Sequence, residues 1–244
     1  LLILIHMAAP FLGILQVNTT FHRPLGDVGN LETWKIPVRI KVVSETSSDE
    51  VVKSSRNYSD SFIEAWTKSA LELVNEGAIA IITLCGFLAT LHPVLQSKLP
   101  VPLGTSALLQ IPFVQKLIPR GKKVGVITFD ADNLGEEHLK AVGVSERDIS
   151  NGNIPIVGVT PNGNFQQILR NGKTFNYLEI EADVVEAARR LIEEQNNVGA
   201  IVLECTNIPP YKRAIFEEVG LPIWDIITLG NFLYESALPQ RYER

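Results

Sequence analysis

Two cysteines, Cys85 and Cys205, are the residues of this 244-residue chain whose type and placement are best suited to chemistry. Each directly follows a run of β-forming residues, 78–84 in one case and 200–204 in the other. In a parallel α/β sheet, ligands bind at the carboxyl ends of the strands. The sequence therefore predicts that both thiols lie at an active site.

Other roles for the cysteines are less consistent with the sequence. The pair is too far apart for a Cys-x-x-Cys redox motif, and two thiols without a nearby histidine or acidic cluster make a poor zinc site. A chain of this length can bury a sufficient core without disulfides. We expect no metal, and the remaining alternative is that both cysteines are buried and inert.

Composition excludes several classes of partner. The chain carries 22 Lys and Arg against 27 Asp and Glu, a net charge of −5, and it has no dense basic run, so nucleic acid is not expected. The apolar residues 1–5 are too few for a membrane span and lack the flanks of a signal peptide. We interpret them as a tail before Met7 and expect a cytoplasmic protein without membrane contact.

Short apolar runs that alternate with helical patterns position the two cysteines. This alternation predicts an α/β fold with a parallel sheet covered on both faces. Eight strands are predicted, at residues 11–17, 37–43, 78–84, 101–105, 123–129, 155–159, 199–204 and 222–225. Helices are predicted at residues 60–75, 106–118, 133–142, 179–195 and 211–219.

An internal repeat relates the two cysteines to each other. Residues 77–85 resemble residues 199–205 with the cysteine in register, and in both cases a helix and a Leu-Pro-led strand follow. The chain is therefore expected to consist of two related α/β halves. If the strand ends of the halves face each other across a cleft, Cys85 and Cys205 approach a ligand from opposite sides.

These motifs resemble the aspartate/glutamate/hydantoin racemase superfamily. The resemblance rests on Ile-Thr-Leu-Cys-Gly-Phe-Leu at 82–88, Val-Leu-Glu-Cys-Thr-Asn at 202–207 and Asp-Val-Gly-Asn at 27–30. It implies two pseudo-symmetric flavodoxin-like domains, each with a roughly four-stranded parallel sheet flanked by helices, and an active site in the interdomain cleft. We expect residues 8–117 and 118–223 to form the two halves, with residues 224–244 packing back on the first.

The resemblance also implies an activity. It makes Cys85 and Cys205 an acid/base pair that works without a cofactor, in a protein expected to form a homodimer or higher homo-oligomer. Gly86 and Phe87 stand where the amino-acid-specific members have Asn-Thr. This difference favours a less polar substrate, as in hydantoin racemases.

Elementary chemistry agrees with a two-thiol site. Inverting a stereocentre requires one group on each face of a carbon, one to remove a proton and one to return it. A free thiol has a pKa of about 8.5, so the base must be activated. Because Thr206 and Asn207 are good helix caps and Pro209 suits a first turn, we predict a helix amino-terminus facing Cys205, making it the more activated thiol.

Residues at the predicted strand ends are candidates for binding the small-molecule substrate. The candidates are Asn18, Thr19, Gly86, Phe87, Thr128, Thr206 and Asn207, among which Thr128 is equally interpreted as an ordinary strand residue. Either His22 or Arg23 in the following loop is able to hold a carboxylate, but solvated surface is the preferred interpretation.

Together these features predict a racemase or epimerase acting on a small carboxylate or cyclic amide. A thiol-dependent decarboxylase or cis-trans isomerase of the same superfamily is one alternative. A binding protein that keeps the two-lobed shape without turnover is the other.

Overall fold

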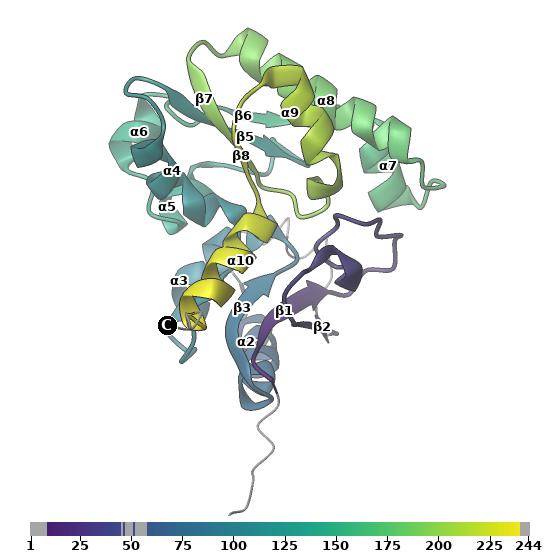
Figure 1. The fold of residues 1–244 in the computed structure, drawn as a ribbon, viewed down its shortest axis with the longest axis vertical. Helices are drawn as coiled ribbons and strands as arrows, with labels where there is room; N and C mark the ends of the chain where they lie inside the picture. Colours follow the sequence, from purple (N-terminus) through teal and green to yellow (C-terminus); the bar gives the residue numbers. More distant parts are fainter. Residues whose placement is uncertain (1–8, 45, 47–50, 52–57, 240–244) are drawn as a thin grey trace, which may run out of the picture.

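The computed structural model describes residues 9–44, 46, 51 and 58–239, which form two parallel four-stranded sheets (Figure 1). The first sheet has the order β2-β1-β3-β4 and the second the order β6-β5-β7-β8. The strands are β1 (Phe11–Val17), β2 (Val38–Val43), β3 (Ala78–Thr83), β4 (Leu103–Gly104), β5 (Lys123–Thr128), β6 (Ile156–Gly158), β7 (Val198–Leu203) and β8 (Ile223–Trp224). The predicted α/β class and all eight strands are confirmed.

The two sheets repeat each other in detail. The pairing of β1 with β3 shifts register between Phe11 and Leu12, and the pairing of β5 with β7 shifts between Lys123 and Val124. The irregularity therefore occurs at the same place in both halves. This equivalence places the ends of β3 and β7, which lead to the two cysteines, at corresponding edges.

The five predicted helices are present, with different bounds in places, and the structure adds helices that were not predicted at residues 92–96, 146–150, 164–171 and 226–237. The helices are α2 (Asp60–Asn75), α3 (His92–Gln96), α4 (Ile111–Leu117), α5 (Glu136–Ala141), α6 (Glu146–Ser150), α7 (Asn164–Asn171), α8 (Tyr177–Glu194), α9 (Lys212–Val219) and α10 (Ile226–Ala237). Short 3-10 helices are η1 (Leu31–Thr33), η2 (Gly86–Leu91), η3 (Ala107–Gln110) and η4 (Pro209–Tyr211). The predicted helix 106–118 is therefore divided into η3 and α4, with a proline in the first turn of α4.

Burial on both faces explains why the strands are apolar runs. In β1, Phe11, Leu12, Ile14 and Leu15 are at most 1% exposed, because α2 and α10 both contact this strand. Strands covered on both faces lose the alternation of polar and apolar residues. None of the described helices is long and apolar enough to cross a membrane.

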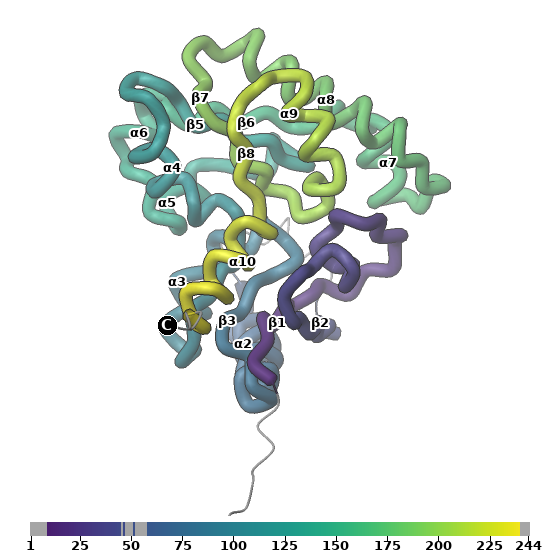
Figure 2. Tube along the Cα trace, viewed as in Figure 1, coloured from purple at the N-terminus to yellow at the C-terminus, as the bar shows by residue number. Residues whose placement is uncertain are grey.

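The C-terminal helix α10 connects the two sheets. It begins directly after β8 of the second sheet, yet it contacts β1, β3 and β4 of the first. Figure 2 shows this yellow segment running from the upper sheet down beside the lower one. The domain boundaries stay a prediction.

Asp225 starts α10, and its replacement by alanine is expected to lower the free energy of unfolding by about 2 kcal/mol. The carboxylate accepts a 2.8 Å hydrogen bond from the Thr228 amide and pairs with Lys212 Nζ at 2.9 Å, with the residue 2% exposed. Urea denaturation measures the loss. Asp225→Asn keeps the cap without the charge and should lose less, whereas an unchanged Asp225→Ala variant would contradict this role.

Candidate active site

A cavity of about 550 Å³ lies at the carboxyl ends of strands from both sheets. Its walls come from the segments that follow β1, β3, β5 and β7, and from Leu169, Arg170 and Asn171 of α7. Both Cys85 and Cys205 line it. The structure thus brings the two cysteines to one cavity, as their equivalent positions predict.

The two thiols occupy matching sites. Each cysteine is the second residue after its strand, β3 for Cys85 and β7 for Cys205. Both are free thiols, with Cys85 half-buried and Cys205 buried. Each half therefore supplies one thiol to the cavity.

Burial keeps both thiols protonated at neutral pH in this structure. It raises the pKa of Cys85 to about 12, and the nearby Glu204 charge adds to the effect, while the amides of Phe87 and Leu88 oppose it. The pKa of Cys205 is raised well above its ordinary value, again by burial and then by Glu204, and only the Asn207 amide opposes this among backbone groups. Two amides thus oppose the raised pKa at Cys85 and one opposes it at Cys205.

The prediction that Thr206 and Asn207 cap a helix next to Cys205 is wrong, although Pro209 does stand in the first turn of a helix there. Thr206 and Asn207 do not cap a helix, because η4 begins after Ile208, which makes no side-chain cap. Thr206 Oγ1 instead donates to the Leu84 carbonyl at 3.0 Å, across to the end of β3. The side chains expected to act locally form contacts between the two halves.

Glu204 is a buried carboxylate beside the cysteines. Burial raises its pKa to about 7, a hydrogen bond from Thr128 lowers it, and the Asp130 charge raises it further. Thr128 Oγ1 donates to Glu204 Oε2 at 2.6 Å and is itself fully buried. Thr128 is not among the residues that line the cavity, so the structure places it behind Glu204 and not against a substrate.

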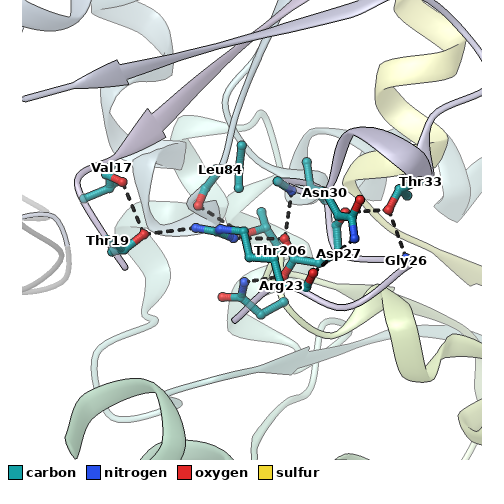
Figure 3. Close-up of polar contacts among 12 residues, drawn as sticks. Val17, Thr19, Arg23, Gly26, Asp27, Asn30, Thr33, Leu84 and Thr206 are labelled. Atoms are coloured by element: carbon teal, nitrogen blue, oxygen red, sulfur yellow. Dashed lines mark hydrogen bonds and ion pairs between the residues drawn. The ribbon is translucent and has the colours of Figure 1, made fainter. Parts of the chain in front are cut away.

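Arg23 and Asp27 form an ion pair in the segment that follows β1, within the polar contacts drawn in Figure 3. Arg23 Nη1 lies 2.9 Å from Asp27 Oδ1, and Arg23 Nη2 donates to Thr19 Oγ1 at 3.0 Å. Asn207 Nδ2 donates to the other Asp27 oxygen at 2.7 Å. The Arg23 side chain is only 12% exposed and lines the cavity, so the solvated-surface interpretation is wrong for this residue.

The remaining predicted binding residues divide into two groups. Thr19, Gly86, Phe87, Thr206 and Asn207 line the cavity. Asn18 is exposed and is not part of the lining, because the chain turns it outward directly after β1. His22 is also exposed and contacts Phe175, with ring centroids 4.5 Å apart.

A second ion pair lies opposite the first and was not predicted. Arg170 Nη2 lies 2.6 Å from Asp130 Oδ2, and the guanidinium covers the Phe129 ring at 4.9 Å. Both charged residues also line a smaller neighbouring cavity of about 300 Å³. Among the described residues, no group of three His, Cys, Asp or Glu side chains is arranged to hold a metal ion.

Comparison with known sequences finds relatives along most of the chain. No protein-family model matches it. Dimethylsulfoniopropionate lyase of Durusdinium sp. clade D is 24% identical over 223 residues, which are 91% of this chain and 73% of that protein. Dimethylsulfoniopropionate lyase 3 of Emiliania huxleyi (strain CCMP1516) is 24% identical over 94% of this chain, which spans 60% of the relative.

Comparison with solved structures identifies the fold. Arylmalonate decarboxylase matches with a TM-score of 0.58 at 14% identity, over 96% of both chains. Glutamate racemase from Francisella tularensis subsp. tularensis SCHU S4, in complex with D-glutamate, matches with a TM-score of 0.50 at 18% identity, over 95% of this chain and 84% of that one. The chain has the fold that these two enzymes share, which confirms the predicted resemblance at the level of the fold.

Proposed function

We propose that this protein is a lyase that removes a proton next to the carboxylate of a small substrate and expels a sulfonium group as a neutral sulfide. The observation that carries the proposal is that Cys85 and Cys205 line one cavity. The similarity to dimethylsulfoniopropionate lyases along most of the chain supports elimination. The racemase function predicted from the sequence becomes the second candidate.

The walls of the cavity suit a small cation. Phe21, Phe87 and Phe129 line it, and aromatic faces attract cationic groups. The lining carries both signs of charge, the carboxylates of Asp130 and Glu204 and the guanidinium groups of Arg23 and Arg170, as a substrate with a sulfonium and a carboxylate requires. The cavity volume of about 550 Å³ is ample for a small carboxylate that carries a sulfonium group.

A cationic substrate also accounts for how the base forms. Both thiols have a raised pKa in this structure, so little thiolate exists at neutral pH. A positive charge within a few ångströms favours the charged form of a thiol and lowers its pKa. Binding of a sulfonium would therefore generate the thiolate, preferentially at Cys85 because two amides already face its sulfur.

The elimination step balances without another reactant. In dimethylsulfoniopropionate the thiolate takes the α-proton, and the electrons of the C–H bond become the new carbon–carbon double bond. The carbon–sulfur bond breaks and dimethyl sulfide leaves with its electron pair. Acrylate and a protonated thiol remain, and Arg23 and Arg170 in the lining supply positive charge for the carboxylate.

Racemisation is kept as a second candidate because each sheet contributes one thiol to the cavity. Inversion needs a proton donor and a proton acceptor on opposite faces of one carbon. Elimination needs only one base. The number of thiols required for turnover therefore separates the two reactions.

The test is to incubate the purified protein with dimethylsulfoniopropionate and follow both products. We expect dimethyl sulfide in the headspace by gas chromatography and an equal amount of acrylate by NMR. Parallel incubations with single enantiomers of amino acids and hydantoins in deuterium oxide follow optical rotation and exchange. Loss of rotation without elimination would favour racemisation, and inactivity in every incubation would contradict the proposal.

A further inference from the structure

Glu204 is a buried carboxylate that the elimination step does not use. It is fully buried, and its Oε1 atom has no hydrogen-bond partner within the part of the chain that the structure describes. The other oxygen is fixed by Thr128 Oγ1 at 2.6 Å. A buried polar atom without a partner is costly, so its retention calls for an explanation.

The position of Glu204 links it to both thiols. It directly precedes Cys205, and a Cβ at Gly86, the residue after Cys85, would lie 2.2 Å from Glu204 Oε1. The backbone carbonyl oxygen of Glu204 would lie 2.3 Å from the same Cβ, so only a glycine fits at that point. The Glu204 charge accordingly raises the pKa of both cysteines.

The charged groups around Glu204 do not neutralise it. Asp130 adds negative charge, and the other titratable neighbours are the two thiols, with Asp27 facing Cys205. Arg23 and Arg170 are paired with Asp27 and Asp130 instead. Because no counter-ion is found among the residues that the structure describes, the carboxylate gains and loses a proton near neutral pH.

Elimination creates a demand for such a group. Each turnover leaves the substrate proton on the thiol, and the thiol must lose it before the next one. In two-base racemisation one thiol gains a proton and the other gives one up, so the pair has no net proton to lose. A lyase built on buried thiols therefore requires a route by which protons leave.

We propose that Glu204 takes the proton from the catalytic thiol when the next substrate binds and releases it to solvent through the cavity, which regenerates the thiolate. This inference rests on the proposed lyase function. The S–H bond breaks, a bond from hydrogen to Oε1 forms, and the carboxylic acid then loses the proton to water. The cation of the next substrate lowers the pKa of the thiol toward that of Glu204 and favours the transfer.

The Glu204→Gln variant tests the relay, because glutamine has nearly the same shape and cannot take the proton. We expect steady-state elimination to fall about 100-fold and to recover in proportion to added imidazole, a small base that enters the cavity. Glu217→Gln, at an exposed pair with Arg213, is the matched control and should keep full activity. Undiminished turnover in Glu204→Gln, or a loss that imidazole does not restore, would overturn the relay.

Alkylation of the thiols separates this inference from the proposed function, because it needs no substrate. Removing the Glu204 charge lowers the pKa of the thiols, so iodoacetamide should react faster with Glu204→Gln than with wild type between about pH 7 and pH 9. If wild type performs no elimination, the proposed function fails. Faster alkylation would then still uphold the coupling of Glu204 to the thiols, and an unchanged rate would overturn it.

A pair of Thr128 variants provides a second readout if Glu204→Gln does not fold. The Thr128 hydrogen bond lowers the pKa of Glu204, so Thr128→Val should raise it. Because the relay needs the ionised carboxylate, the acid limb of the pH profile of kcat should move to higher pH. Thr128→Ser keeps the hydroxyl and should not move it, and an unmoved limb in Thr128→Val would contradict the relay.

Discussion

Cys85→Ser is expected to reduce turnover at least about 1000-fold while the protein stays folded. Serine has nearly the volume of cysteine, but its hydroxyl is far less acidic than a thiol and supplies no anion at neutral pH. Cys85 is the expected base because the amides of Phe87 and Leu88 stabilise its thiolate. The measurement is kcat for sulfide release, with thermal unfolding as the check on folding.

Cys205→Ser is the matched comparison. The Cys205 thiol of wild type lies in the same cavity, but its pKa is raised well above the ordinary value and fewer amides oppose this shift. If elimination uses one base, this variant should lose less activity than Cys85→Ser. An equal loss in both variants would indicate that the two thiols act together, as racemisation requires, and full activity in Cys85→Ser would exclude it as the base.

The difference in free energy of unfolding between Glu204→Gln and wild type should change by about 3 kcal/mol between pH 4 and pH 8. Folding raises the pKa of Glu204 from 4.5 to about 7, so the folded state holds the proton more tightly than the unfolded state. The bound proton therefore stabilises folded wild type at low pH, and this stabilisation is lost as the pH rises through that window. Glutamine does not titrate, so the variant gains relative to wild type at high pH.

Urea denaturation at several pH values measures this difference. Its absolute size also includes the hydrogen bonds of the new amide, but those do not vary with pH, so the slope reports Glu204. Glu217→Gln at the surface should show a small and constant difference. A difference for Glu204→Gln that is independent of pH would contradict the raised pKa.

The strands and the meeting of the two cysteines could be predicted because both follow from local pattern. Doubly covered strands are continuous apolar runs, and the repeat fixed Cys85 and Cys205 at equivalent strand ends. Glu204 also left a signal, since it is an acidic residue ending the apolar run of β7. A single charge at a strand end was not enough to predict a buried carboxylate.

Long-range contacts account for what the sequence did not reveal. Asn207 was expected to cap a local helix, but its amide donates to Asp27, 180 residues away. Arg23 pairs with that same Asp27, which is four residues away, and the Asn207 amide ties this local ion pair to the second half. Asn18 was expected to bind substrate because it stands at a strand end. It is exposed instead, since the loop after β1 turns it outward.

The contact of Gly86 with Glu204 has a consequence for how such sequences diverge. A Cβ at position 86 would lie 2.2 Å from Glu204 Oε1 and 2.3 Å from the backbone carbonyl oxygen of Glu204. The carbonyl oxygen is present whatever residue stands at position 204, so no single substitution there makes room for a side chain at position 86. A descendant that gains a side chain after its first cysteine therefore has to move the main chain of one half against the other.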